Sequence, residues 1–131
     1  PYTFELLVRQ LQQELDQSNT KKTWSSKVID YCQSQLNRLA EVSKDEAAEY
    51  LHTSPRTLTR KLQSEDQSFK QIVDTIIKES AEHFLLNTDL SVQEIANKLG
   101  FTSQKVFGST FKRLGGLSPV NFRKSRLTDQ E

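Results

Sequence analysis

Apolar residues in this chain recur every three or four positions, which is the spacing of one face of an α-helix. The interval is kept over several stretches that short polar or glycine-containing segments separate. No stretch shows the alternation of apolar and polar residues that marks a half-buried strand. The pattern therefore predicts an all-α fold.

The first apolar stripe spans residues 4–15 and predicts an amphipathic helix, and the polar residues 16–23 that follow predict a linker. We treat 1–24 as one N-terminal segment. A second helix is predicted over about 25–39, with a buried face of Val28, Ile29, Cys32, Leu36 and Leu39. Because Cys32 lies on this apolar face, we interpret it as a core residue and not as a reactive thiol.

Two shorter helices are predicted next, from their start signals. Ser43 to Glu46 form a capping-box pattern, in which the serine hydroxyl accepts an amide and the glutamate reaches back to the cap. The helix they open ends near Tyr50. Ser54 and Pro55 then start another helix as N-cap and first-turn residue, and Leu58 and Leu62 form its buried stripe.

A longer helix is predicted over about 69–86, and a second capping box at residues 91–94 opens the short helix after it. Gly100 ends that helix, since glycine readily adopts the left-handed conformation of a tight turn. A further helix follows over about 103–114, with Phe107 and Phe111 on its buried face. Ser118 and Pro119 start a last helix that runs to about 126, and residues 127–131 form a C-terminal tail.

A short capped helix, a tight turn and a second helix thus occur twice, over about 43–63 and about 91–114. At an offset of 49 residues, the apolar positions match as Ala47 with Ala96, Tyr50 with Leu99, Leu58 with Phe107 and Leu62 with Phe111. The repeated unit is a helix-turn-helix. We expect two such subdomains joined by a long linker helix, plus the extra N-terminal helix.

In a helix-turn-helix the second helix lies in the DNA major groove, so the residues opposite its buried stripe are the candidates for base contact. Helical geometry gives these outward residues as Arg56, Thr59, Arg60 and Gln63 in the first unit, and Lys105, Gly108, Ser109 and Lys112 in the second. Gln104, at the start of the second helix, is a further candidate for its chemistry. Arginine can bond guanine through two hydrogen bonds, and glutamine can do the same with adenine. The helix N-termini at Ser54 and Ser103 can offer backbone amides to phosphate.

The charge distribution agrees with a polyanionic partner. Residues 52–126 hold twelve Lys and Arg against seven Asp and Glu, a net +5 within a chain whose total is +1. The chain has one Cys and two widely separated His, which make no metal set. We predict His52 as an exposed turn residue and His83 as a partly buried one, with no catalytic constellation and no Gly-rich phosphate loop. We therefore expect neither enzymatic activity nor a cofactor.

The spacing of residues in the second unit resembles the signature of the AraC/XylS family of bacterial transcription regulators. The matching motifs are Ile95-Ala96-x-x-Leu99-Gly100-Phe101, Phe107-x-x-x-Phe111-Lys112 and Gly116-x-Ser118-Pro119-x-x-Phe122-Arg123. Upstream, Ser54-x-Arg56-Thr57-Leu58-x-Arg60-x-Leu62, Ser68-Phe69 and Ala81-x-x-x-Leu85 resemble the first half of the same domain. The resemblance covers about residues 25–126. It implies seven helices and two recognition helices that enter successive major-groove segments on one face of the DNA. It also implies base contacts from Arg56, Thr59 and Arg60, and from Gln104, Lys105, Gly108 and Ser109.

Three positions depart from the family pattern. Asp66 stands where Gly is frequent, and Ile77 stands where Arg is frequent, so we expect the linker helix to lack an ion pair there. Val106 replaces a common aromatic residue, which should loosen the packing beside Phe107. Since Gly108 and Ser109 are weak base readers, we expect the first unit to carry more of the base discrimination.

The resemblance implies double-stranded DNA and RNA polymerase as partners, together with an N-terminal effector or dimerisation domain. The first residue is Pro and the chain has no Met, so we expect a fragment of a longer, cytoplasmic, nucleoid-associated protein with no membrane span. The helix at 4–15 is either the tail of a missing regulatory domain or a helix packed on this domain, and the polar linker favours the first. The alternative function is a helical protein-interaction module that does not read DNA. Basic residues without acids on both outward stripes favour DNA.

Overall fold

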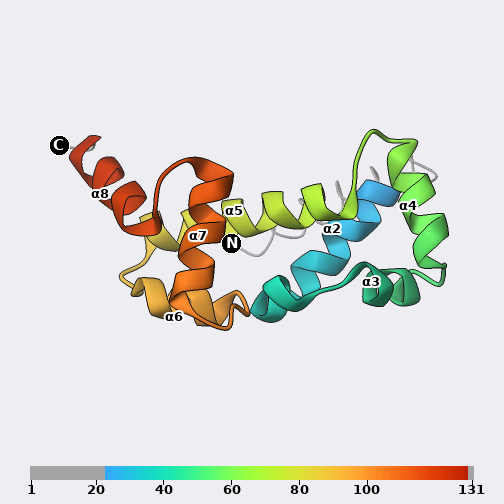
Figure 1. The fold of residues 1–131 in the computed structure, drawn as a ribbon, viewed down its shortest axis with the longest axis horizontal. Coiled ribbons are helices and arrows are strands. Elements are labelled where there is room, and N and C mark those ends of the chain that lie inside the picture. The colour runs from blue at the N-terminus through green and yellow to red at the C-terminus, as the bar shows by residue number, and fades with distance from the viewer. Residues whose placement is uncertain (1–22, 130–131) are drawn as a thin grey trace, which may run out of the picture.

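The computed structural model describes residues 23–129 as helices joined by short turns (Figure 1). The elements are α2 (Trp24–Ser34), the 3₁₀ helix η1 (Leu36–Glu41), α3 (Lys44–Tyr50), α4 (Pro55–Gln63), α5 (Phe69–Asn87), α6 (Val92–Lys98), α7 (Gln104–Gly115) and α8 (Pro119–Asp129). The all-α prediction is confirmed, whereas the helix predicted at 4–15 and its linker lie outside the described residues. None of the described helices combines the length and apolar character that a bilayer crossing requires.

The long helix α5 joins two lobes. Figure 1 shows α2, α3 and α4 gathered around one end of α5, and α6, α7 and α8 around the other. Each lobe has its own apolar core, and α5 contributes Ile72, Ile76 and Ile77 to the first and Ala81 and Leu85 to the second. Each helix-turn-helix is therefore held by its own core, and both cores depend on the same helix.

The helix α8 completes the second lobe and covers the end of α5. Phe122 packs edge-on against Phe111 of α7, with ring centroids 5.5 Å apart. Arg123 donates hydrogen bonds to the carbonyl oxygens of Leu85 (2.9 Å) and Thr88 (3.3 Å). These carbonyls close the C-terminus of α5, where a positive charge also favours the helix dipole.

The helix α2 ends five residues earlier than predicted. The Ser34 hydroxyl donates to the Tyr31 carbonyl (2.6 Å) and the Gln35 amide to the Cys32 carbonyl (3.0 Å), so the chain tightens before η1 begins. The buried face changes accordingly: Tyr31 is buried, whereas Ile29 and Leu36, both predicted as core, are 36% and 39% exposed. Cys32 is fully buried and burial raises its thiol pKa to about 11, which confirms its core assignment.

The capping boxes differ from the prediction at one of the two sites. Ser91 and Glu94 form both halves of a box, as predicted, and Ser68 with Gln71 form another that was not predicted. At the first site only the Ser43 half forms, with its hydroxyl accepting the Glu46 amide at 3.1 Å. The Glu46 side chain instead binds Arg38 and Tyr31. An ion pair with Arg38, eight residues earlier in the chain, therefore replaces the bond within the first turn of α3.

The two helix-turn-helix units match at two offsets and not at a single offset of 49. Around the turn, the bond from the Thr53 amide to the Ala48 carbonyl is repeated 48 residues later by Phe101 and Ala96, each at 2.9 Å. In the recognition helices, the bond from Leu58 to Ser54 is repeated 49 residues later by Phe107 and Ser103. The second turn therefore contains one extra residue, Thr102.

The predicted pairing of Tyr50 with Leu99, and of Ala47 with Ala96, is consequently wrong by one position. Leu99 is fully buried, while Tyr50 is 59% exposed and stacks at 5.0 Å from Tyr31. At the corrected offset of 48, Leu51 is the counterpart of Leu99. The pairings of Leu58 with Phe107 and of Leu62 with Phe111 are confirmed, since all four side chains are buried.

Ile77 is a core residue, and an ion pair of α5 lies one turn earlier, where Asp74 Oδ2 lies 3.7 Å from Arg113 Nη1 of α7. The expectation that Val106 loosens the packing beside Phe107 is wrong. Val106 is 45% exposed and lies outside the core. Phe107 stays fully buried against Phe101 and Phe111, so the small valine does not loosen its packing.

A carboxylate from the turn after α4 caps the start of α2. Glu65 accepts the backbone amides of Trp24 (2.8 Å) and Ser25 (3.0 Å). Burial acts to raise the pKa of Glu65, but the Ser25 and Trp24 donors outweigh it and leave the pKa below its ordinary value. The next residue, Asp66, adopts a φ of +59°, in the left-handed region that disfavours most side chains.

Replacing Asp66 by Gly is expected to raise the free energy of unfolding by about 0.5–1 kcal/mol, because glycine adopts a positive φ without steric cost. Urea unfolding of the purified chain measures the change. Asp66→Ala is the matched control, since it removes the same charge and keeps a Cβ. An equal gain in both variants would assign the effect to charge and not to backbone strain.

Replacing Glu65 by Gln is expected to lower the free energy of unfolding at pH 7 by about 1–2 kcal/mol. The backbone amides of Trp24 and Ser25, at the start of α2, then bind a neutral oxygen in place of a charged carboxylate. The folded-state pKa of Glu65 is lowered, so its contribution exists above the ordinary glutamate pKa and disappears as the pH falls through the folded value. The difference between the two proteins in urea unfolding should therefore shrink from pH 7 towards pH 3. A difference that stays constant with pH would show that the carboxylate charge plays no part.

Candidate nucleic-acid interface

The first candidate surface is the outward face of α4. Ser54 caps this helix by accepting the Thr57 amide at 3.1 Å, and Pro55 occupies its first position. Leu58 and Leu62 then point into the core. As a result, the four predicted residues share one face of α4: Arg56, Thr59, Arg60 and Gln63. Together with Lys44 and Thr57 they line an open groove of about 620 Å³.

The second candidate surface is the outward face of α7, built in the same way. The Ser103 hydroxyl accepts the Val106 amide at 3.1 Å, and Phe107 and Phe111 fill the core. The five predicted residues lie together along a groove of about 560 Å³: Gln104, Lys105, Gly108, Ser109 and Lys112. The structure thus gathers each predicted set on one face.

Sequence reasoning missed the residues that form the other walls of these grooves. Lys44, at the start of α3, faces the first groove, and its counterpart at the offset of 48, Val92, faces the second. The start of α8 adds Ser118, Pro119 and Val120. The serine and proline marked a helix start in the sequence, but their position beside α7 depends on the packing of α8 against α5.

The two grooves have different chemistry. The α4 face carries two guanidinium groups, and the Thr59 hydroxyl oxygen is buried with no hydrogen-bond partner among residues 23–129. On α7 the counterpart of Arg56 is Lys105, and Thr59 and Arg60 are replaced by Gly108, which has no side chain, and Ser109, whose hydroxyl donates to the Val106 carbonyl at 3.2 Å. The first face therefore presents more groups for specific contacts, and the second allows a closer approach to the helix backbone.

Within the described part of the protein, no contact and no backbone angle requires a glycine at position 108 on the α7 face. A Cβ built on Gly108 meets no atom within 4 Å, and its φ is not in the left-handed region. Glycine inside a helix costs about 1 kcal/mol relative to alanine. A helix that bears this cost without a packing benefit is typical of a surface that contacts something outside the protein.

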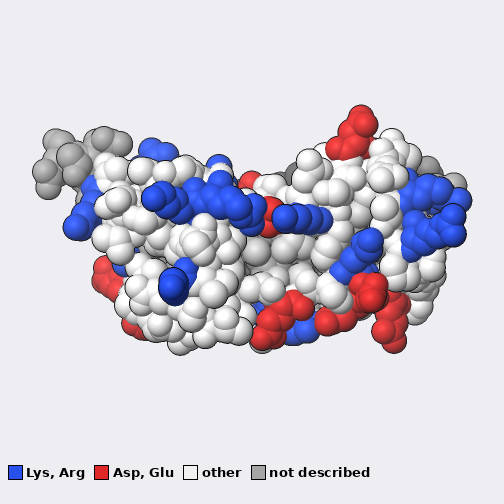
Figure 2. Space-filling view, in the orientation of Figure 1, with Lys and Arg blue, Asp and Glu red and all other residues white. Residues whose placement is uncertain are grey.

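Charge is distributed unevenly over the molecule. Figure 2 shows Lys and Arg over α4 and in a row across α7 and α5, while Asp and Glu gather mainly along the lower edge, around η1 and α3. No acidic residue lies on the groove linings of α4 and α7. Both surfaces therefore suit an anionic partner.

The two histidines lie outside these grooves. His52 is an exposed turn residue, as predicted, with a φ of +59°. His83 is also exposed, not partly buried, and its Nδ1 lies 3.2 Å from the Asn87 amide nitrogen. Within residues 23–129, no three His, Cys, Asp or Glu side chains gather closely enough to hold a metal ion.

Comparison with known families identifies the class of helix-turn-helix. The model of an AraC-type family, described as a helix-turn-helix domain, matches residues 47–125. The chain belongs to the AraC family of transcription regulators. The matched region begins within α3, ends within α8 and includes every lining residue of both grooves except Lys44.

Similar sequences in this family belong to longer proteins. The chain is 38% identical over 78 residues to the transcriptional regulator VqsM of Pseudomonas aeruginosa, a match that covers 60% of this chain and 24% of VqsM. It is 36% identical over 81 residues to the ornithine utilization regulator of the same organism, which covers 62% of this chain and 24% of the relative. The chain thus matches about a quarter of the length of these relatives.

Solved structures agree with the fold. The C-terminal domain of AraT, a response regulator from Geobacillus stearothermophilus, matches with a TM-score of 0.72 and 30% identity, covering 79% of this chain and 86% of that one. The DNA-binding domain of the transcriptional factor AdpA, solved in complex with a target DNA, matches with a TM-score of 0.69 and 25% identity, covering 79% and 93%.

Replacing Gly108 by Ala is expected to raise the free energy of unfolding by about 0.5–1 kcal/mol, because the new methyl group meets no atom and alanine favours the helix. Urea unfolding measures the gain. Gly116→Ala is the contrasting control, because Gly116 has a φ of +85° and its replacement should destabilise the protein. A loss of stability in Gly108→Ala would show that the glycine has a structural role.

Proposed function

We propose that this AraC-family domain binds double-stranded DNA in a sequence-specific manner and regulates transcription, with α4 and α7 as its two recognition helices. The observation that carries the proposal is the pair of acid-free grooves, each lined by the outward face of the second helix of a helix-turn-helix unit. The DNA complex of the similar AdpA domain supports it.

The length of α5 supports binding to two successive segments of the major groove. Its 19 residues correspond to about 28 Å, close to the roughly 34 Å of one DNA turn. A lobe at each end of α5 therefore stands at a separation suited to two neighbouring major-groove segments. We infer that one chain contacts both.

The residues on α4 have distinct proposed roles. Arg56 and Arg60 are suited to bond guanine through two hydrogen bonds each. Thr59 carries a methyl group that can contact thymine, whereas its hydroxyl oxygen is buried. Gln63 lies one turn further along the same face and can pair with adenine or reach the backbone.

On α7 the proposed contacts depend on close approach. Gly108 and Ser109 allow the helix backbone to come near the base edges, where Gln104 and Lys105 can form hydrogen bonds. Lys112 lies one turn deeper, beside the start of α8, and suits a phosphate. At the start of α7, the Val106 amide is bound by the Ser103 hydroxyl, and the amides of Gln104 and Lys105 can bind a phosphate. At the start of α4, Pro55 has no amide hydrogen to donate, so the N-terminus at Ser103 is the better phosphate site.

The wider partners remain part of the proposal. The chain spans about a quarter of its similar relatives, which supports a longer regulator with an effector or dimerisation domain. We propose RNA polymerase as the further partner through which a bound regulator acts. A module that binds only protein is the competing function.

The test is a fluorescence anisotropy titration of the chain with labelled genomic DNA fragments at several salt concentrations. Binding should strengthen steeply as salt falls, because phosphate contacts release counterions. Selection from a random DNA pool should then give a defined site. No binding at low salt would reject the proposal in favour of a protein-interaction module.

The first unit is expected to carry more of the base discrimination. Arg56→Ala and Arg60→Ala should each cost about 1–3 kcal/mol on the selected site and relax the preference at nearby positions. Lys105→Ala and Ser109→Ala should relax it less. Binding-site selection with each variant measures this, and a stronger relaxation from the α7 variants would contradict the assignment.

The Gly108→Ala variant should bind the selected site more weakly although it is more stable, because its methyl group holds α7 away from the bases. Anisotropy titration of the selected DNA measures the affinity. Val106→Ala, on the same helix but outside the groove, is the control and should bind as the unaltered chain does. Unchanged affinity in Gly108→Ala would show that α7 does not approach DNA closely at this point.

A further inference from the structure

The 3₁₀ helix η1 belongs to the first lobe in sequence but contacts the turn of the second. The Ala40 amide donates to the Leu99 carbonyl at 2.9 Å. A Cβ built on Gly100 would lie 2.6 Å from Arg38 Cα and 2.9 Å from its carbonyl carbon, closer than real Cβ atoms approach. The backbone of η1 therefore contacts the backbone of the turn between α6 and α7. Figure 1 shows η1 next to the end of α6.

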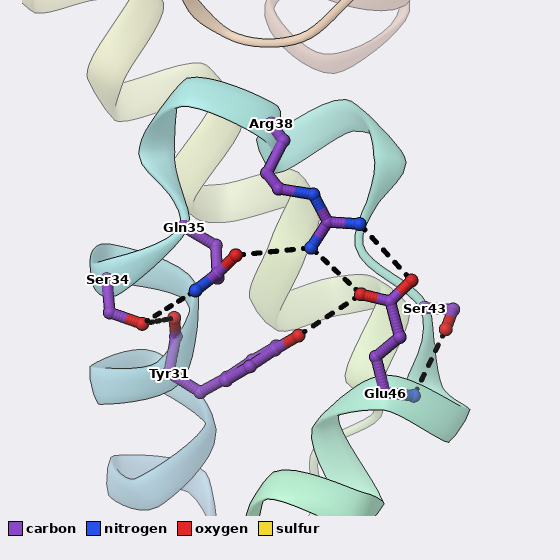
Figure 3. Close-up of polar contacts among 6 residues, drawn as sticks. All are labelled: Tyr31, Ser34, Gln35, Arg38, Ser43 and Glu46. Atoms are coloured by element: carbon purple, nitrogen blue, oxygen red, sulfur yellow. Dashed lines mark hydrogen bonds and ion pairs between the residues drawn. The ribbon is translucent and has the colours of Figure 1, made fainter.

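Arg38, whose backbone lies against Gly100, binds the first helix-turn-helix unit with its side chain. Arg38 donates to both carboxylate oxygens of Glu46 on α3, from Nη1 at 2.8 Å and from Nη2 at 3.2 Å (Figure 3). The Gln35 amide oxygen accepts a further bond from Nη1 at 3.1 Å, and the Tyr31 hydroxyl donates to Glu46 at 3.4 Å. The carboxylate interaction raises the pKa of Arg38 and lowers that of Glu46. One residue thus connects α3 of the first unit to the turn of the second.

The contact continues into the second recognition helix. Phe101, directly after Gly100, packs against the cores of both lobes. Its ring centroid lies 5.2 Å from that of Phe107, the fully buried residue of α7. A displacement of η1 against the turn would therefore move α7.

The need for glycine at position 100 comes from η1 in addition to the positive φ of the turn itself. His52 is the counterpart of Gly100 in the first turn at the offset of 48, and it also has a positive φ, +59° against +84°. The first turn thus accepts a large side chain at a positive φ, although this φ is smaller than that of Gly100. What distinguishes the second turn is the Arg38 backbone, whose Cα would lie 2.6 Å from a Cβ at position 100.

We propose that η1 is a second connection between the two helix-turn-helix units, and that Arg38 and Gly100 are positioning residues that set the relative orientation at which α4 and α7 meet DNA. The helix α5 fixes the distance between the lobes, and a rotation of one lobe about the α5 axis would change the direction of α7 relative to α4. A backbone contact away from that axis opposes such a rotation. The proposal rests on the proposed DNA binding, but its geometric part does not need DNA.

The first test compares two glycine variants, Gly100→Ala and Gly116→Ala. Both glycines have nearly the same φ, +84° and +85°, but a Cβ at Gly116 meets no atom within 4 Å. The two changes therefore carry the same backbone strain, and only the first disturbs η1. Both proteins are studied well below their melting temperatures, with the unaltered chain as reference.

The DNA measurement uses duplexes that carry the selected site with one base pair added or removed between its two halves. The unaltered chain and Gly116→Ala should lose about tenfold in affinity on each altered spacing, because only one recognition helix then fits. Gly100→Ala should bind the original spacing about tenfold more weakly and discriminate less between spacings. A Gly100→Ala profile that matches Gly116→Ala would overturn the proposal.

The second test measures the geometry without DNA and also serves if Gly100→Ala does not fold. Spin labels at Glu49→Cys on α3 and Asn97→Cys on α6, both exposed, report the distance between the units by pulsed electron spin resonance, and the native Cys32 is fully buried. Arg38→Ala, which removes the guanidinium but keeps the backbone, should broaden or shift the distance distribution. Arg38→Lys, which loses the paired bonds to Glu46, should do so partly. A distribution unchanged in Arg38→Ala would overturn the role of Arg38.

The two tests separate this inference from the proposed function. If the unaltered chain binds no DNA, the proposed function fails, and the spin-label distances still test whether η1 holds the two units together. If it binds DNA but neither the spacing profile nor the distances respond to Arg38 and Gly100, the proposed function stands and the positioning role is rejected.

Discussion

The burial of one apolar stripe of α5 in two separate cores is the constraint on which the rest of the structure depends. Ile72, Ile76 and Ile77 belong to the first core, and Ala81 and Leu85 to the second. A buried Ile or Leu side chain contributes about 1.5–3 kcal/mol, so α5 stabilises both lobes at once. Since neither lobe has a complete core without α5, the two recognition helices are attached to the same rigid element.

Local signals in the sequence were sufficient for most of the fold. Serine N-caps mark the starts of α3, α4, α6 and α7, and each hydroxyl accepts the expected amide. The apolar spacing identifies the buried face of α4 and α7, and hence the outward residues of each groove. These features depend on contacts within one or two turns of the chain. Residues that are close in sequence therefore carry the information.

The errors occur where contacts between distant segments decide the structure. The apolar period continues past Ser34, so nothing local shows that α2 ends there and that η1 turns towards the second lobe. Glu46 has a suitable local partner for a capping box, but the charged bond to Arg38 is stronger and takes its side chain. The extra residue Thr102 is invisible in an apolar pattern because the two recognition helices still align at 49.

The two repeated units differ in the residues of the groove and in the residues of the turn. On the groove side, α4 has large, charged groups, and α7 has Gly108 and Ser109. On the turn side, the first unit has the exposed His52, while the second has Gly100 against the Arg38 backbone. In the first unit, which has the larger groove residues, the turn residue His52 is exposed, and in the second unit, where Gly108 and Ser109 allow close approach, the turn contacts the backbone of η1. Close approach demands accurate placement, because Gly108 and Ser109 have no long side chain that could reach across a gap between the α7 backbone and a base. The position of η1 behind the second turn is consistent with that demand.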